Sequence, residues 1–294
     1  GFTLVELSIV LVIIGLIIGG VLVGQDLIKA AEIRATVSQI ESYNAAVNTF
    51  RGRFNGLPGD IRNVTSFFDA GSGNTWPDLI DGDGDRSLEA CEDGTGPGND
   101  STNDTDGLCN GVDPHEYVDV ATLAEHTGEL LQFWHHLSAA ELVPGYYNGC
   151  YFGGAGDSGS VADCGLLEAA FPRSKMDRNG IGVYATGGRN YYQIGVTGAA
   201  MAYEVEPSLT PEEAYNLDQK MDDGKPGTGA VVAKSAQAGG TAVNTAMAAA
   251  DGDFTASATA TACVAEDVTG VTAPQWTYAL LNENITCSLR LRMN

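Results

Sequence analysis

A short acidic segment carries the clearest pattern of side chains that could do chemistry. Residues 81–92 read DGDGDRSLEACE, with carboxylates at relative positions 1, 3, 5, 9 and 12, on Asp81, Asp83, Asp85, Glu89 and Glu92. Oxygen ligands at these spacings bind calcium in EF-hand-type loops. Arg86 occupies the position where such loops use glycine. The pattern therefore predicts a looser calcium loop, and a solvated acidic loop without a metal ion is the alternative.

Two further acidic groups have weaker spacing. One lies within residues 100–106 and combines three aspartates with an asparagine. The other is the pair Asp222 and Asp223, which precedes a glycine. We expect this pair to form a turn that ends a helix, with a cation site as the alternative.

Glu6 is a charged residue at the N-terminal edge of a long apolar stretch. The residues from Leu7 to Gly24 include no charged side chain, and their 18 positions approach the length that spans a membrane. A carboxylate at membrane depth is costly without a partner. The candidate partner is the N-terminal amine of a neighbouring copy. A signal-peptide core, which is shorter and follows basic residues, and a buried core helix are the alternatives.

A single long helix must position this stretch. Apolar residues recur at spacings of three, four or seven through the second half of the segment, at Ile33, Val37, Ile40, Val47, Phe50 and Phe54. This is the periodicity of an amphipathic helix. No proline occurs before Pro58, so residues 2–54 could form one helix of about 80 Å.

The first 15 residues, GFTLVELSIVLVIIG, resemble the processing and assembly motif of type IV prepilins and type II secretion pseudopilins. The resemblance implies that a prepilin peptidase cuts after the glycine and methylates Phe2. It also implies that Glu6 pairs with the amine of a neighbouring subunit during assembly. Gly1 precedes the expected mature end, so it is either a retained leader residue or a sign of shifted cleavage.

The family resemblance also implies a fold and a function. The expected fold class is α+β: a long N-terminal helix, membrane-spanning then amphipathic, packs on an antiparallel β-sheet in a globular head with long loops. The expected function is that of a major pilin, which leaves the inner membrane through the pilus assembly machinery. It then polymerises with copies of itself into an extracellular type IV pilus, a helical filament for adhesion or motility. A type II secretion pseudopilin and a minor or tip pilin acting as an adhesin are the alternatives.

The chain divides into the helix, residues 1–54, and an acidic head, residues 55–294. Within the head we expect an acidic loop insertion at 61–117, a helix at 118–143, a sheet at 145–206 and a low-complexity loop at 235–262. A short helix should begin after Thr210 and end at Met221, because proline and acids occupy its first turn. The chain closes with an alternating strand, CSLRLRM.

The six cysteines indicate disulfides in an oxidising compartment, because their number is even and none forms a Cys-x-x-Cys pair. Pairing of neighbours in sequence is the simplest connectivity, and the others stay open. It joins Cys91 with Cys109, Cys150 with Cys164, and Cys263 with Cys287. Paired cysteines near the C-terminus of many pilins support the last bridge.

The net charge of −23 limits the classes of partner. Residues 1–55 hold four acidic and four basic side chains, so the whole excess lies in residues 56–294. Such a surface repels phosphate, which predicts no direct nucleic-acid binding. The sequence has no nucleophile–histidine–acid constellation and no phosphate-binding glycine loop, and we predict that the chain is not an enzyme.

Overall fold

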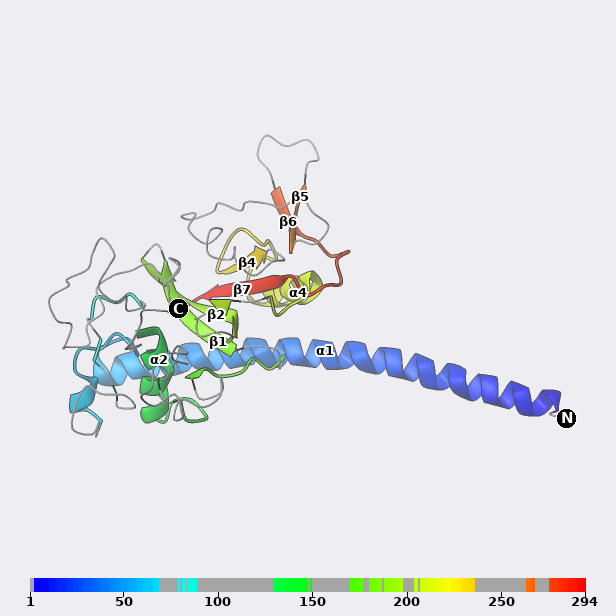
Figure 1. Cartoon of the computed structure of the whole chain (residues 1–294), viewed down its shortest axis with the longest axis horizontal. Helices are drawn as coiled ribbons and strands as arrows, with labels where there is room; N and C mark the ends of the chain where they lie inside the picture. Colours follow the sequence, from blue (N-terminus) through cyan, green and yellow to red (C-terminus); the bar gives the residue numbers. More distant parts are fainter. Residues whose placement is uncertain are drawn as a thin grey trace, which may run out of the picture.

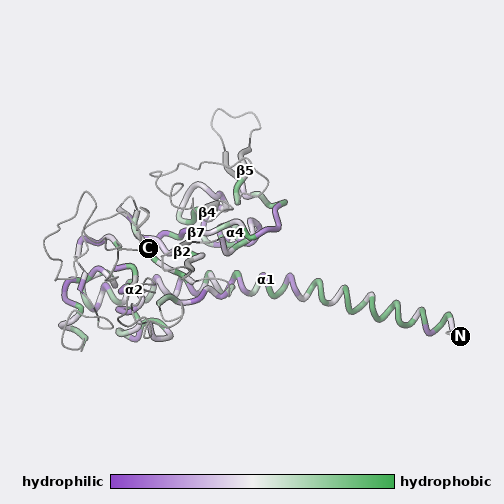
Figure 2. The backbone as a smooth tube through the Cα atoms, viewed as in Figure 1, coloured by the Kyte–Doolittle hydropathy of each residue, from purple (hydrophilic) through white to green (hydrophobic). Residues whose placement is uncertain are grey.

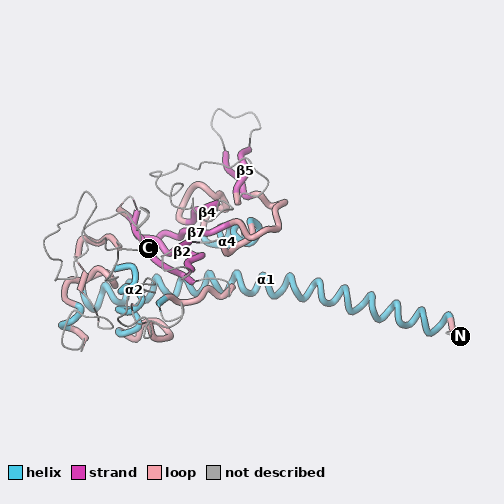
Figure 3. Tube along the Cα trace, viewed as in Figure 1, coloured by secondary structure: helices cyan, strands magenta, loops and turns pink. Residues whose placement is uncertain are grey.

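The computed structural model consists of one long helix and a head gathered around the second half of that helix (Figure 1). It describes residues 3–68, 79, 81–82, 84–88, 129–147, 149, 170–176, 180–186, 188–197, 204–205, 207–235, 263–267 and 275–294. The head combines helices with antiparallel strands (Figure 3). The predicted α+β layout, with a long N-terminal helix and an antiparallel sheet, is confirmed.

The long helix, α1 (Leu4–Phe54), has a defined start and a defined end. Thr3 caps its first turn, and no proline interrupts its 51 residues, which span about 76 Å. It ends where Asn55 takes the left-handed conformation, with φ 55°, and donates its N–H to the Arg51 carbonyl at 2.9 Å. The predicted helix over 2–54 is thus confirmed from Leu4 onward, and Phe2 lies outside the described residues.

The two halves of α1 differ in burial. Residues 4–28 are exposed apart from the partly buried Gly24, whereas one face of the second half is buried in the head. The buried side chains are Ile33, Thr36, Ile40, Tyr43, Ala46, Val47 and Phe50. Figure 2 shows the same division as a continuous apolar half followed by a half of mixed polarity. The predicted amphipathic half is therefore confirmed.

The main sheet is antiparallel, in the order β1 (Gly180–Thr186), β2 (Arg189–Thr197), β7 (Cys287–Arg292) and β4 (Val231–Ser235). The short β3 (Glu204–Val205) pairs with the end of β2. A separate pair joins β5 (Val264–Asp267) to β6 (Gln275–Tyr278). The β1–β2 hairpin closes where Thr186 pairs with Arg189, and Gly188 supplies the positive φ of 69° that this tight turn uses.

Aromatic side chains bind α1 to the rest of the head. Trp134, on α2 (Glu129–Ala139), packs edge-on against Tyr43 of α1 with ring centroids 4.7 Å apart. Phe133 of α2 meets Trp134 at 4.9 Å, and Tyr192 of β2 completes the cluster. The core therefore lies between α1, α2 and the sheet. A short 3-10 helix, η1 (Val64–Ser66), follows α1.

The predicted helix over 118–143 is only partly correct. Within the described residues it is α2, which ends at Ala139, and residues 118–128 lie outside them. Glu141 takes a left-handed φ of 56°, and the Leu142 N–H donates to the Leu137 carbonyl at 3.0 Å. This reversal ends the helix before Pro144 can do so.

The predicted sheet over 145–206 also needs correction. The first described strand begins at Gly180, and the described parts of 145–176 contribute only a bridge between Arg173 and Gly180. The sheet is completed by two strands from outside that range, β4 and β7. We predicted the strand at β7, and also the short helix, which is α4 (Pro211–Met221). We did not predict β4, whose last residue, Ser235, begins the expected low-complexity loop.

Candidate functional site

The apolar half of α1 is the largest candidate site. Within the described residues, α1 is the one helix long and apolar enough to cross a membrane by length and composition, and none of its most apolar 18-residue window is buried. A core helix of a soluble protein would be mostly buried. A Cβ atom built on Gly15, Gly19 or Gly20 would touch nothing within 4 Å. The described part of the head therefore leaves this surface uncovered, apart from the partly buried Gly24.

Glu6 forms a capping box with Thr3 at the start of that half. The Glu6 carboxylate accepts hydrogen bonds from the Thr3 N–H at 2.7 Å and from the Thr3 hydroxyl at 2.9 Å. The Thr3 hydroxyl in turn accepts from the Glu6 N–H at 3.3 Å. The sequence carries the signal for this box, a threonine followed three residues later by a glutamate, but we did not predict the cap from it.

These local hydrogen bonds satisfy polar groups but do not neutralise the Glu6 charge. A carboxylate at membrane depth still lacks a counter-ion within the described part of α1, where the next basic residue is Lys29. Gly1 and Phe2 lie outside the described residues. Pairing of Glu6 with the amine of another copy thus stays a prediction.

The predicted calcium loop is described in part. The Asp81 carboxylate accepts from the N–H of Thr65 at 3.1 Å and from its hydroxyl, and Asp85 accepts from the Ser87 N–H at 2.6 Å. The buried Asp60 accepts from the Arg86 N–H at 3.0 Å. These bonds fold the acidic segment back onto the chain that leaves α1.

Gly82 shows how closely these two segments approach. A Cβ atom at Gly82 would lie 2.4 Å from the Asp60 Cα, so no other residue fits there. Asp83, Glu89 and Glu92 lie outside the described residues, as does the acidic group at 100–106. The calcium loop at 81–92 accordingly stays a prediction.

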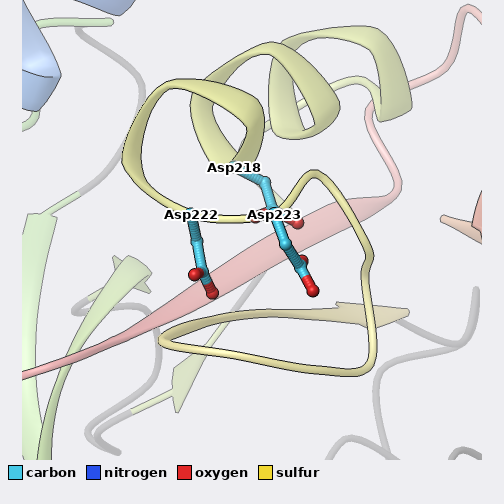
Figure 4. Close-up of side chains that lie close together, drawn as sticks. All are labelled: Asp218, Asp222 and Asp223. Carbon is cyan, nitrogen blue, oxygen red and sulfur yellow. The ribbon is translucent and has the colours of Figure 1, made fainter.

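Three carboxylates converge at the end of α4 (Figure 4). Asp218, Asp222 and Asp223 each offer an oxygen, and these three oxygens lie within 4.8 Å of one another. Asp218 is buried, whereas the other two are exposed. Carboxylate oxygens in such a group are the ligands that calcium and magnesium prefer.

The same carboxylates bind the loop between α4 and β4. The buried Asp218 accepts from the Tyr278 hydroxyl at 2.7 Å and from the Gly224 N–H at 3.2 Å. Asp222 accepts from the N–H groups of Ala230 and Val231. The predicted turn at Asp222 and Asp223 is therefore confirmed, and its cation-binding alternative stays open.

Burial sets the electrostatics of this acidic turn. It raises the pKa of the Asp218 carboxyl to about 6, against the opposing effect of the hydrogen bonds from Tyr278 and Gly224. The negative charges of Asp223 and Asp222 raise it further. Burial, together with the charge of Asp218, also raises the pKa of Tyr278. The turn thus favours a proton or a cation near Asp218.

Asp218 and its partner Tyr278 were not predicted from the sequence. Asp218 lies four residues before Asp222 and so on the same side of a helix, which was a usable signal. Tyr278 lies 60 residues further along the chain and carries no local signal.

The predicted disulfide between Cys263 and Cys287 is confirmed. It joins the start of β5 to the start of β7, across a sequence separation of 24 residues. The other four cysteines, Cys91, Cys109, Cys150 and Cys164, lie outside the described residues, so their pairing stays a prediction.

Comparison with known proteins adds no family to these observations. No protein-family model, curated protein or solved structure matches the chain.

Proposed function

We propose that this protein is a pilin-like structural subunit, which inserts into a membrane through the first half of α1 and then polymerises into an extracellular filament. The exposure of that half is the observation that carries the proposal, because an apolar surface of this length must be covered by lipid or by other copies. The N-terminal resemblance to type IV pilins supports the second step. In the filament, the apolar halves would bundle while the acidic heads face outward.

Glu6 provides the test, because its two roles can be separated. Glu6→Gln keeps a side chain that can complete the capping box but removes the negative charge. Thr3→Ala removes the cap and keeps the charge. If charge pairing between copies drives assembly, Glu6→Gln should abolish filaments in negative-stain images of shed surface material, while Thr3→Ala should still assemble.

The opposite pattern would contradict charge pairing. Normal filaments from Glu6→Gln with defective ones from Thr3→Ala would leave Glu6 a role in the helix cap alone. The wild-type chain must itself form long fibres of this one protein. Their absence from the shed material would contradict the assignment as a major subunit.

A structural calcium ion belongs to the same proposal. Two acidic regions support it: the 81–92 loop, by spacing, and the acidic turn of Asp218, Asp222 and Asp223, by convergence. Removal of calcium should lower the unfolding temperature of the full chain in detergent, because repulsion among the carboxylates then increases. Addition of calcium, but not of magnesium at the same ionic strength, should restore it.

Two double variants identify which acidic region binds calcium. Asp81→Asn with Asp85→Asn affects the 81–92 loop, and Asp222→Asn with Asp223→Asn affects the acidic turn. The pair that abolishes the response to calcium marks the binding region. An unfolding temperature that the chelator leaves unchanged would remove calcium from the proposal.

A further inference from the structure

The loop between β6 and β7, residues 279–286, exposes apolar side chains outside α1. Leu281 is 101% exposed, Leu280 51% and Ile285 47%. Leucine at a fully exposed position needs an explanation when two more apolar side chains lie in the same short loop. We call residues 279–286 the leucine loop.

The backbone of the leucine loop is held in place. The Ala279 N–H donates to the Cys263 carbonyl at 3.0 Å, and the Asn282 N–H donates to the Ala279 carbonyl at 2.8 Å. At its end, the Thr286 N–H donates to the Leu209 carbonyl, and the disulfide at Cys287 follows. The leucines are therefore presented by a fixed turn.

The loop occupies the end of the head that faces the apolar half of α1. In Figure 1 it is the red segment that leaves β6, extends past the end of α4 toward the N-terminal side and returns into β7. Figure 2 shows an apolar part followed by a polar part along this segment. On α1, the exposed Leu27 and Ile28 directly follow the charged Asp26 that closes the apolar stretch.

We propose that the leucine loop is a second membrane contact, which inserts Leu280 and Leu281 into the surface of the bilayer that α1 spans. This inference rests on the proposed membrane insertion of α1. If α1 crosses a bilayer, the loop is at the end of the head nearest the lipid in every copy. A second copy of the chain is the alternative partner for the loop. Nothing in the described part of the chain places a second copy against it, whereas a bilayer crossed by the first half of α1 would lie beside it.

The composition of the loop suits shallow insertion. Its sequence, ALLNENIT, carries one charge, Glu283, in a chain with a net charge of −23. The low charge reduces the cost of approaching lipid, while Asn282 and Asn284 offer amides to the headgroups. An interfacial contact of this kind places the apolar side chains at the boundary between headgroups and acyl chains and leaves the polar side chains among the headgroups. The contact would restrict the tilt of the head over the membrane before assembly.

The experiment places a fluorescent label on the full chain in phosphatidylcholine nanodiscs. Leu281→Cys carries the label, and Ile285→Cys is an independent position on the same loop in case the first variant misfolds. Asn63→Cys is the matched control, because it is exposed and lies beyond the far end of α1. Nitroxide-bearing lipids should quench the loop labels at least about twofold more than the control, since such insertion reaches only the headgroup boundary.

The outcomes separate this inference from the function on which it rests. Protein that co-purifies with the nanodiscs but shows equal quenching at the loop and at Asn63 would overturn the inference and leave membrane insertion intact. Protein that fails to enter nanodiscs would overturn both. A third outcome is that the lipids do not quench the loop labels, while the label emission changes with the number of copies per disc. This outcome would assign the loop to contact with a second copy and would also overturn the inference.

Discussion

At the scale of single residues, two carboxylates accept hydrogen bonds in different surroundings. Glu6 lies on an exposed helix and is bonded only within its own turn, to Thr3. Asp218 is buried and bonded across the fold, to Tyr278. Hydrogen bonds stabilise both carboxylates but supply no positive charge, so each can still attract a cation or an amine.

Asp218 should make the stability of the head depend on pH. Its folded pKa of about 6 lies above the ordinary value of 3.8, so the folded state binds this proton more tightly than the unfolded chain does. The stabilisation is complete below the lower value and is lost as pH rises through the higher one. Asp218→Asn should therefore lose stability relative to wild type, on the order of 1 kcal/mol, as pH falls from about 7 to about 4.

Urea unfolding of both proteins across this pH range measures the difference. Asp223→Asn is the control: slight burial raises the pKa of Asp223, but the hydrogen bonds from Thr228 and Lys225 outweigh it, and the net shift is downward. Its difference from wild type should change with pH in the opposite direction. Parallel curves for the two variants would show that the buried position of Asp218 has no special effect.

At the scale of elements, the sequence predicted the helices and the strand whose formation depends on residues close together in the chain. The α1 and α4 helices followed from apolar spacing and from first-turn residues, and β7 from alternation. The β4 strand was missed because its five residues adjoin an alanine- and glycine-rich stretch and form a strand only beside β7. The meeting of Asp218 with Tyr278 likewise depends on a contact between distant segments. Pairing partners of this kind cannot be derived from one sequence.

The division of α1 into two halves predicts that the same substitution has a large effect in one half and a small effect in the other. Ile40 is fully buried in the head, so Ile40→Ala should reduce the free energy of unfolding by about 2–5 kcal/mol. Ile17 is 58% exposed on the same helix, and Ile17→Ala should change it by less than about 0.5 kcal/mol. Urea unfolding in detergent, followed by tryptophan fluorescence, reports on the head because Trp134 packs against Tyr43.

Helix propensity does not confound the comparison between these two variants. Alanine favours helix more than isoleucine does, so neither change weakens α1 itself. Equal losses of stability from the two variants would mean that the apolar half also packs on the head in solution. The prediction that only the second half of α1 packs on the head would then be wrong.

At the scale of the whole molecule, charge and apolar surface are kept apart. The 55 residues that include α1 are neutral in sum, and the head carries the net charge of −23. Association through α1 would thus bring strongly acidic heads together. Attraction in the filament core would have to exceed repulsion at its surface, and salt acts differently on the two.

Assembly should therefore strengthen as ionic strength rises. Repulsion between exposed heads extends over about 30 Å at 0.01 M salt but only about 10 Å at 0.1 M, whereas a pair formed by Glu6 in an apolar core is screened much less. The fraction of protein that sediments as filaments should increase across this range of sodium chloride. Glu6→Gln should remain unassembled at every concentration, because screening between heads cannot replace a charge pair in the core. Filaments that dissociate as sodium chloride rises would instead show that attraction between exposed charges holds the copies together, which the distribution of charge in this chain argues against.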